Sequence, residues 1–461
     1  MQPSKLNLDL GYEEALNYHS PEDRGFFSVL FATGRTLVDK QGKTFKEKRQ
    51  TSYFISDLQR ASQEWSGSLD VWIGQNEFRR PNRRLTNLLR LCTSFVDIDF
   101  YNVASLARLT PDQVTQRIFS VLQDAQLPFP NIVVESGRGL QIKWTYKEKL
   151  PAGALPRWKA VQAHLIDLLS HLGADPNAQD GSRVLRLAGT LHSYNRTLVQ
   201  MLRLDPNPVD FDQFANAVLP FTQSELAELR KERGEKVRKL REQEKREKKA
   251  KQLVLVSNNR EQSGNLHQKG FGSLNWSRYQ DLLKLCRMRG TIKDGQRTQM
   301  LVYLLNFMLL SGVATHHTKL DKELRAMIFE IDPTWSFDDS RLTTLLRKAE
   351  ARDRGETVNF RDEQWTPLYT PKTRTLIDLF EITSDEERSL STIISKAEKD
   401  RRRRQRDEEK RRASGMIPRS DYEAMSVERK KPWESEGVSR ATYYRREKAQ
   451  KHAEENRILT L

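Results

Sequence analysis

The stretch Ser94-Phe95-Val96-Asp97-Ile98-Asp99-Phe100 places two carboxylates in an otherwise apolar segment. Such a segment predicts a buried β-strand, with Asp97 and Asp99 on one face and Ile98 on the other. Adjacent carboxylates repel and are costly to bury, and a divalent cation removes that cost; their hard oxygens suit Mg²⁺ or Mn²⁺. The strand therefore predicts a metal site for phosphoryl transfer. The alternative is a strand end whose acids face solvent or pair with nearby arginines.

Two later segments carry groups suited to a phosphorylated ligand. In the segment Glu135-Ser136-Gly137-Arg138-Gly139-Leu140-Gln141, the glycines allow a tight turn with exposed amides, and Ser136 and Arg138 add side-chain donors. In Asp180-Gly181-Ser182-Arg183-Val184-Leu185-Arg186, an acid precedes a short strand with two arginines that could hold a triphosphate. Asp175 competes with Asp180 for the place of a third carboxylate, and Asp180 is preferred because it directly abuts the arginine strand. Taken singly, these segments also fit an ordinary hairpin turn and ordinary salt bridges.

Predicted helices and strands alternate around these segments. Thr110-Pro111-Asp112-Gln113 predicts the start of a helix that runs to about Ala125, and Pro156–Leu172 predicts a second helix. Further strands are predicted at residues 131–135, 140–146, 184–187 and 199–204. The alternation predicts an α/β domain over residues 1–222.

In this order the three segments resemble the motifs of the archaeo-eukaryotic primase superfamily, in its plasmid and phage primase–polymerase branch. The resemblance covers about residues 50–200 and includes a lead-in at residues 74–78, followed by Arg83 and Arg84. It departs at Gln141, where the family often has a nucleotide-binding histidine, and at Ala188, where a proline is usual. The first departure leaves open whether Gln141 supports full catalysis.

The resemblance implies an RRM-like α/β palm with a second small α/β unit, and metal-dependent nucleotidyl transfer on a DNA template from nucleoside triphosphates. The implied catalytic residues and ligands of Mg²⁺ or Mn²⁺ are Asp97, Asp99 and Asp180. The implied nucleotide-binding residues are Ser136, Arg138, Gln141, Arg183 and Arg186. Template and primer are expected near Arg79, Arg80, Arg83 and Arg84. The chain contains no Gly-x-x-x-x-Gly-Lys-Ser/Thr loop, so a separate helicase is the expected partner.

The rest of the chain is predicted to be helical. Residues 223–262 are dominated by Glu, Lys and Arg and predict a charged helical linker. Residues 263–360 include the apolar run 300–310 and predict a small all-α domain, similar to the helical domain that follows such primase modules. In the basic helical region 361–461, a capping box at Thr383 predicts one helix that continues through Ile393 and Ile394 into Arg401–Arg404.

Residues 430–448 have the form helix, glycine turn, helix. Ser439 is a suitable N-cap, and the second helix displays Arg440, Arg445 and Arg446. This pattern resembles a helix-turn-helix, whose second helix enters the major groove of duplex DNA. The alternative is a basic helix that folds onto its own domain through Trp433 and Tyr444.

Composition agrees with a nucleic-acid partner. The net charge is +16 and the pI is about 9.7, which favours a polyanion. The two cysteines, Cys92 and Cys286, lie far apart in apolar runs and predict neither a zinc site nor a disulfide. No secretory signal or membrane-spanning run is evident, so a cytoplasmic location without a membrane partner is expected.

The sequence as a whole predicts a DNA primase/polymerase that replicates a plasmid or other mobile element, acting on single-stranded template and on duplex origin DNA. Two alternatives stay open. One is a replication initiator that binds an origin and has lost catalysis, which Gln141 favours and the intact acids disfavour. The other is a helix-turn-helix transcriptional regulator, which leaves the α/β domain unexplained. Whether the primers are DNA or RNA is undecided.

Overall fold

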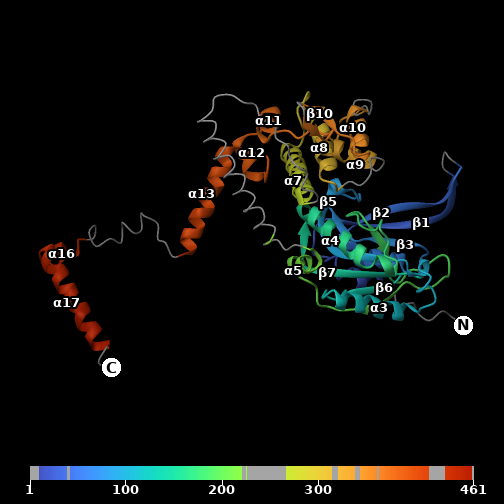
Figure 1. Cartoon of the computed structure of the whole chain (residues 1–461), viewed down its shortest axis with the longest axis horizontal. Helices are drawn as coiled ribbons and strands as arrows, with labels where there is room; N and C mark the ends of the chain where they lie inside the picture. Colours follow the sequence, from blue (N-terminus) through green and yellow to red (C-terminus); the bar gives the residue numbers. More distant parts are fainter. Residues whose placement is uncertain are drawn as a thin grey trace. The chain divides into compact units, whose positions relative to one another are not determined.

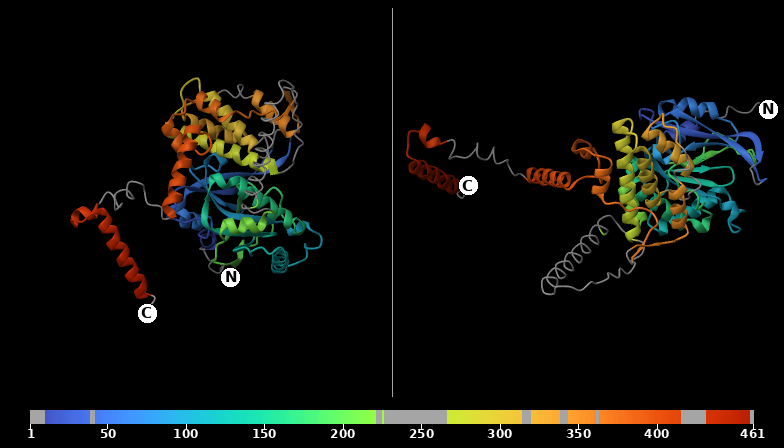
Figure 2. Two further views of the ribbon diagram at one scale, coloured as in Figure 1. Left: turned by 60° about the vertical axis from the view of Figure 1, so that its left-hand side comes forward. Right: turned by 90° about the horizontal axis from the view of Figure 1, so that it is seen from above.

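The computed structural model describes residues 10–38, 42–220, 225, 266–313, 320–337, 343–360, 363–414 and 431–458. The chain forms two compact units: Met1–Lys372 with Leu390–Thr392, and Thr373–Ser389 with Ile393–Leu461 (Figures 1 and 2). The predicted α/β domain (1–222) and helical domain (263–360) both lie in the first unit. The predicted linker 223–262 lies outside the described residues, apart from Glu225.

A nine-stranded sheet forms the body of the first unit, in the order β8-β3-β1-β4-β5-β7-β6-β9 with β2 paired to β1 (Figure 1). All pairs between its named strands are antiparallel. The nine strands join in one sheet, so the expected second α/β unit has no sheet of its own in the described part of the chain. The strands are β1 Phe26–Val38, β2 Thr44–Phe54, β3 Val71–Gly74, β4 Asn76–Phe78, β5 Leu88–Ile98, β6 Ile132–Glu135, β7 Leu140–Pro151, β8 Val184–Arg186 and β9 Gln200–Leu204.

Five helices accompany this sheet: α1 Leu10–Ala15, α2 Leu58–Trp65, α3 Pro111–Asp124, α4 Leu155–Leu168 and α5 Phe211–Val218. The predicted capping box is confirmed, since Thr110 Oγ1 accepts a hydrogen bond from the Gln113 amide at 3.3 Å and Pro111 opens α3. Short 3₁₀ turns lie at Ile55–Asp57, Leu85–Asn87, Phe100–Asn102, Ala152–Ala154 and Ser170–Leu172. The last turn ends at Gly173, whose positive φ stops the helix predicted to reach Leu172.

The remainder of the first unit is mainly helical. It contains α7 Leu266–Arg289, α8 Arg297–Leu310, α9 Leu320–Ile331 and α10 Thr343–Asp353, with α7 packed on α8 and α9 (Figure 1). The apolar run 300–310 lies in α8 and is mostly buried, as predicted. The all-α prediction for this region missed one feature, a hairpin of β10 Val358–Phe360 and β11 Glu363–Trp365. Among the described helices, none is long and apolar enough to cross a bilayer.

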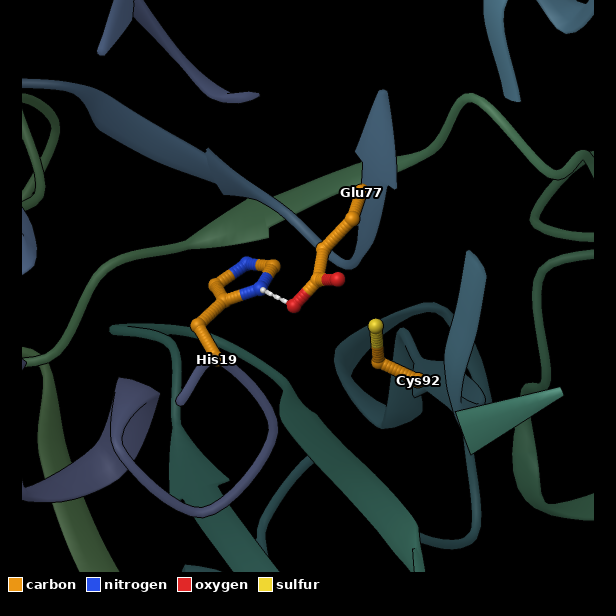
Figure 3. Close-up of side chains that lie close together, drawn as sticks. All are labelled: His19, Glu77 and Cys92. Atoms are coloured by element: carbon orange, nitrogen blue, oxygen red, sulfur yellow. Dashed lines mark hydrogen bonds and ion pairs between the residues drawn. The ribbon is translucent and has the colours of Figure 1, made fainter. Parts of the chain in front are cut away.

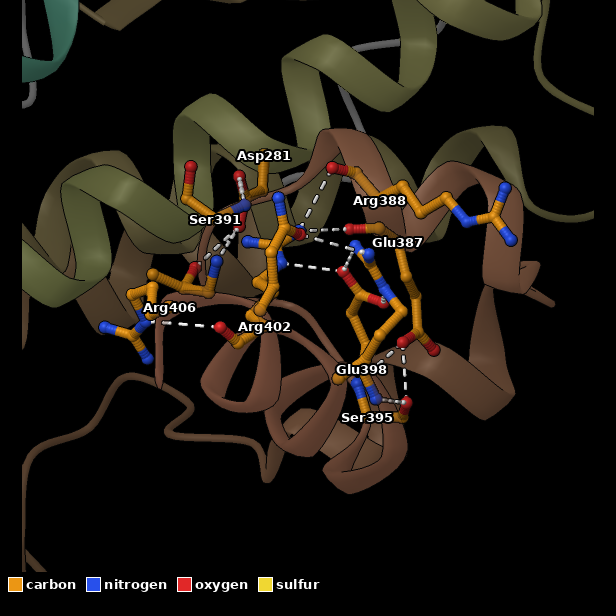
Figure 4. A network of polar contacts seen from close by, with 11 residues as sticks. Asp281, Glu387, Arg388, Ser391, Ser395, Glu398, Arg402 and Arg406 are labelled. Atoms are coloured by element: carbon orange, nitrogen blue, oxygen red, sulfur yellow. Dashed lines mark hydrogen bonds and ion pairs between the residues drawn. The ribbon is translucent and has the colours of Figure 1, made fainter. Parts of the chain in front are cut away.

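The second unit contains α11 Thr373–Leu379, α12 Ser384–Ser389, α13 Lys396–Ala413, α16 Pro432–Ser435 and α17 Arg440–Ile458. The single helix predicted to run from Thr383 into the arginines is wrong, because α12 ends before Ile393 and α13 begins anew. Ser395 caps α13 by accepting from the Glu398 amide at 3.2 Å, and its own Oγ donates to Glu387 at 2.6 Å (Figure 4).

The two cysteines behave as the sequence predicted for core residues. Cys92 and Cys286 are buried and free. Cys92 belongs to a hydrophobic cluster with Phe27, Val29 and Ile73 from β1 and β3.

Candidate active site

A cavity of about 580 Å³ opens in the first unit, and its walls combine acidic and basic side chains. Eight of its lining residues are those that the sequence assigned to catalysis, metal or nucleotide: Asp97, Asp99, Ser136, Arg138, Gln141, Asp180, Arg183 and Arg186. Others come from segments without a predicted role, among them Lys48, Trp72, Tyr101 and His192. The fold therefore brings three sequence motifs, more than 80 residues apart at their extremes, into one hollow.

The acidic wall begins at the end of β5. Asp97 lies in the strand and Asp99 follows it, and both are half-buried and face the cavity. Burial raises the pKa of Asp97 to about 6, and the charge of Asp99 adds to that rise. Burial also raises the pKa of Asp99, with a contribution from Asp175. These carboxylates repel one another in the absence of a cation, which is the electrostatic condition that a divalent metal relieves.

Asp175 lies closer to these acids in the structure than its place in the sequence suggests. Its backbone amide donates to the Asp97 carbonyl at 2.8 Å, and its charge raises the pKa of both Asp97 and Asp99. Asp180 also lines the cavity, but its Oδ1 accepts from the amide and the Oγ of Ser182 at 3.1 and 2.7 Å. Asp175 Oδ1 accepts similar bonds from Asn177 at 2.9 and 3.2 Å, so these bonds do not separate the two acids. What favours Asp175 as the third carboxylate is its charge coupling to Asp97 and Asp99.

The basic wall is built on β8 and β3. Arg183 pairs with Asp175 at 2.9 Å, and Arg186 pairs with Asp70 at 2.8 Å. Although burial opposes it, hydrogen bonds from Ser193 and Arg186 lower the pKa of Asp70 to about 2. These ion pairs orient the two guanidinium groups on the wall of the cavity.

Trp72 adds an aromatic surface to this wall. The Lys48 ammonium lies 4.1 Å from the centre of its ring, and the Arg186 guanidinium lies 4.9 Å from it. Both cations line the cavity with Trp72, so the wall offers fixed positive charge to an anionic ligand.

The glycine turn after β6 is shaped by close packing. The Ser136 amide donates to the Gly139 carbonyl at 2.9 Å. A Cβ on Gly139 would lie 2.5 Å from the Ile98 carbonyl oxygen, next to the acids. Gly139 is therefore required by the approach of the turn to β5, a reason different from the exposed amides that the sequence suggested.

Two buried polar atoms at this site have no hydrogen-bond partner in the described part of the chain. They are Gln141 Oε1 and Arg183 Nε. Gln141 lies directly opposite Asp97 in the β5–β7 ladder, and both residues line the cavity. A free oxygen and a free guanidinium N–H beside the carboxylates fit a divalent cation and a phosphorylated ligand, since buried polar groups are normally satisfied.

His192 brings an imidazole to the cavity, which the sequence analysis did not foresee. It is buried, and its Nδ1 accepts from the Tyr194 amide at 3.1 Å, so that the ring proton lies on Nε2. Burial and the nearby Arg186 lower its pKa, which keeps the ring neutral at pH 7. His192 thus supplies a neutral N–H donor to the cavity that also contains Gln141 of β7, the position at which the resembled family often has a histidine.

Arg138 stands between two tyrosines. Its guanidinium lies 4.4 Å from the ring centre of Tyr101 and 4.9 Å from that of Tyr194. Tyr194 is 78% exposed, while Tyr101 and Arg138 line the cavity. The cavity therefore has an open aromatic surface beside it.

Among known proteins, the chain is similar to one curated protein over most of its length. No family model matches the chain. Over 366 residues, which are 78% of this chain and 75% of the relative, it is 27% identical to a replication protein of Clostridium perfringens. The chain resembles a replication protein.

Three solved structures are also similar. The AEP domain of cyanophage S-2L primase-polymerase is 16% identical, with 46% of this chain and 97% of that chain covered and a TM-score of 0.30. The catalytic domain of primase RepB′ in complex with initiator DNA is 14% identical (51% and 99% covered, TM-score 0.26), and primase RepB′ is 12% identical (75% and 98% covered, TM-score 0.25). The similarity to a replication protein agrees with the replication role that the sequence predicts. Because these TM-scores are low, the roles of the cavity residues are argued below from the side chains of this protein alone.

The four arginines expected to bind template and primer lie in different surroundings, and only Arg83 is among the residues that line the cavity. Arg83 lines the cavity, donates to the Ser182 carbonyl, and reaches Gln50 Oε1 at 3.3 Å through Nε. Arg80 pairs with Glu330 of α9 at 2.9 Å. Burial lowers the pKa of Arg79. Arg84 is partly exposed.

In the second unit, the C-terminal arginines lie on α17. Arg440 packs over Trp433 with its guanidinium 5.5 Å from the ring centre, whereas Arg445 and Arg446 are exposed. Trp433 also contacts Tyr443 and Tyr444, with ring centres 6.3 and 6.2 Å apart. Ser439 caps α17, as the sequence predicted.

Ala188, the second departure from the family pattern, has a structural cause. Its amide donates to the buried carboxylate of Glu14 at 3.1 Å, a bond that a proline cannot make. Glu14 also pairs with buried Lys143 and accepts from the Tyr18 hydroxyl at 3.0 Å. Alanine at this position therefore completes a buried ionic network.

A second cluster of potential metal ligands lies elsewhere in the first unit, at His19, Glu77 and Cys92 (Figure 3). Glu77 is already compensated by Lys149 at 2.5 Å and by Arg90, and His19 bonds to it at 3.3 Å. Burial raises the pKa of the Cys92 thiol well above its usual value, which disfavours the thiolate that a metal needs. The cluster is better explained as a buried ionic network than as a metal site.

Proposed function

We propose that the chain is a DNA primase–polymerase that replicates a plasmid or other mobile element by metal-dependent nucleotidyl transfer. The observation that carries the proposal is the convergence of the acidic, glycine-turn and arginine motifs on one cavity. A helix-turn-helix regulator would have no use for such a cavity. The similarity to a replication protein supports the same class of activity.

The carboxylates of Asp97, Asp99 and Asp175 would hold Mg²⁺ or Mn²⁺, with Gln141 Oε1 beside them. A bound ion supplies charge neutralisation and polarises the attacking and leaving oxygens. Asp180 acts differently: through Ser182 it fixes the turn that leads into β8. Asp97, Asp99 and Asp175 would thus form the metal site on the acidic wall of the cavity.

The basic wall would bind the triphosphate of the incoming nucleotide. Arg183 and Arg186 are held by carboxylates, Lys48 adds charge, and His192 donates a neutral Nε2–H. Fixed donors of this kind orient a phosphate chain without reorganisation. Ser136 lies beside them on the turn. The exposed ring of Tyr194 would stack on a nucleobase at the mouth of the cavity, since stacking tolerates every base.

The remaining assignments concern partners. The template is single-stranded DNA, and α17 of the second unit would bind duplex origin DNA through Arg445 and Arg446. A separate helicase would open the duplex. We place the protein in the cytoplasm, where this chemistry has its substrates.

The test is synthesis. Purified protein with single-stranded DNA, Mn²⁺ or Mg²⁺ and labelled nucleotides should make new strands, and Asp97→Ala and Asp99→Ala should make none while still binding DNA. Offering ribonucleotides and deoxyribonucleotides separately decides which primers are made. A wild-type protein that binds origin DNA yet never incorporates nucleotide would instead be the non-catalytic initiator.

A further inference from the structure

The loop between β4 and β5, residues 79–87, joins the cavity to the helical part of the first unit. The loop closes on itself, since the Arg79 amide donates to the Asn87 carbonyl at 2.7 Å. Near its middle, Arg83 extends into the cavity and is held there by Ser182 and Gln50. Burial lowers the pKa of Arg83 to about 10, so the side chain remains charged at neutral pH.

Glu323 of α9 forms hydrogen bonds with the same loop. Its buried carboxylate accepts from the amide of Leu85 at 2.8 Å, and from the amide and Oγ1 of Thr86 at 2.9 and 2.8 Å. The Tyr279 hydroxyl of α7 bonds to Thr86 Oγ1 at 2.8 Å. Three hydrogen bonds on one buried carboxyl group fix the single turn Leu85–Asn87.

A second buried carboxylate reinforces this contact. Glu330 of α9 binds Arg80 of the loop at 2.9 Å and Arg287 of α7 at 2.6 Å. Arg287 in turn donates to the Thr86 carbonyl at 3.1 Å. Arg80 also lies over the Phe329 ring, 4.5 Å from its centre. The loop is thus bound by charged groups of two helices far along the chain.

We infer that Glu323 is a positioning residue for nucleotide binding: by fixing Leu85 and Thr86, it holds Arg83 in the cavity, where Arg83 would bind the nucleotide and not the template that the sequence suggested for it. The helical part of the first unit thereby completes the nucleotide site without touching the nucleotide. The inference rests on the proposed function, because it assumes that the cavity binds a nucleoside triphosphate. It explains why Arg83 lies between two parts of the loop that bind buried carboxylates: Arg80, which pairs with Glu330, and Leu85–Thr86, which donate to Glu323.

The test is a double-mutant cycle on the full chain. Binding of fluorophore-labelled dATP with Mn²⁺ is measured for the wild type, Glu323→Gln, Arg83→Ala and the double variant. Each single variant should raise Kd and KM about tenfold with kcat within about twofold, and the double variant should be no worse than Arg83→Ala. Additive effects would mean that Glu323 does not act through Arg83.

Asp332→Asn is the matched control. Asp332 is a buried carboxylate that follows α9, and it pairs with Arg297 at 3.0 Å and with Thr334, neither of which belongs to the loop. It should match Glu323→Gln in lost thermal stability while leaving Kd within about twofold of wild type. If Glu323→Gln fails to fold, Thr86→Val removes two hydrogen bonds at nearly constant volume and takes its place.

The outcomes separate the two ideas. If the wild type does not bind the labelled nucleotide, the proposed function fails, and the inference with it. If Arg83→Ala weakens binding but Glu323→Gln and Thr86→Val both bind like wild type, the proposed function stands and the positioning role is wrong.

Discussion

Gly137 and His192 are packed so closely that a Cβ atom on Gly137 would lie 2.6 Å from the Cβ of His192. Gly137 also has a backbone φ of +104°, which residues other than glycine rarely adopt. The glycine turn and the histidine are therefore one assembled feature, although 55 positions separate them in the sequence.

Gly137→Ala should displace His192 and strain the turn. We expect a loss of about 2–4 kcal/mol in unfolding free energy and weak nucleotide binding. Denaturant unfolding and nucleotide titration measure both. Gly153→Ala is the control, because nothing lies within 4 Å of a Cβ there. Equal behaviour of the two variants would contradict the packing argument.

His192→Ala should raise the nucleotide KM about tenfold, since one hydrogen bond to a charged phosphate is lost. His192→Gln retains an N–H donor and should recover part of the loss. Because the ring is already neutral, the KM of the wild type should not change between pH 7 and 8.5. A KM that rises as His192 loses a proton in this range would show instead that the charged form binds.

The third acid can be decided by paired amide substitutions. Asp175→Asn should reduce synthesis at least 100-fold, because a ligand charge beside Asp97 and Asp99 is lost. Asp180→Asn keeps an oxygen that can accept from Ser182, so it should retain activity within about tenfold. Primer-extension rates at saturating Mn²⁺ measure both. The reverse order would restore Asp180 to the metal site.

Asp97 should make stability depend on pH and metal. Its folded pKa of about 6 exceeds the ordinary 3.8, so the stability linked to its protonation is present below pH 4 and is lost as pH rises through 6. In chelator at pH 7.5, Asp97→Asn should be about 1–3 kcal/mol more stable than wild type, and equal to it at pH 3.5. Mn²⁺ should stabilise the wild type and have little effect on the variant. The same stability difference between variant and wild type at both pH values would argue against the buried charge.

Exposed arginines of α17 should set the salt dependence of duplex binding. Arg445→Ala or Arg446→Ala should reduce the log–log slope against salt by about one unit if each contacts a phosphate. A base contact would instead cost about 1–3 kcal/mol on origin DNA and little on random DNA.

Tyr444→Ala should unfold the module through loss of Trp433 packing. If every arginine variant bound like wild type, Arg404 would be the next candidate of the run Arg401–Arg404, since Arg401 and Arg402 pair with Glu398 and Arg403 pairs with Asp407.

The sequence could predict the motifs but not all their neighbours. The alternation around Asp97 and the cap at Thr110 are local signals: the cap located the start of α3, and the alternation located only the C-terminal half of β5, which begins at Leu88 and ends at Ile98. Trp72 and His192 reach the cavity because β3 pairs with β8 and Leu191 bridges to Leu69, positions more than 100 residues apart, whereas Lys48 lies on β2, the hairpin partner of β1. No spacing in the chain encodes that pairing.

The choice between Asp175 and Asp180 shows the same limit. Adjacency to the arginine strand favoured Asp180, whereas the backbone bond from Asp175 to Asp97 joins positions 78 residues apart. The one helix expected after Thr383 failed for a local reason, since Ser395 is itself a strong cap.

The order of the site residues along the chain has a consequence during synthesis on the ribosome. The acids leave the ribosome early, but Arg183, Arg186 and His192 follow about 90 residues later, and Glu323 more than 100 residues after them. At about 5–20 residues per second, a nascent chain spends roughly 5–18 seconds with Asp97 and Asp99 synthesised and their counter-charges missing. A cation captured by Asp97 and Asp99 in that interval would neutralise them before the rest of the site exists, so cellular metal supply would influence the yield of folded protein as well as its activity.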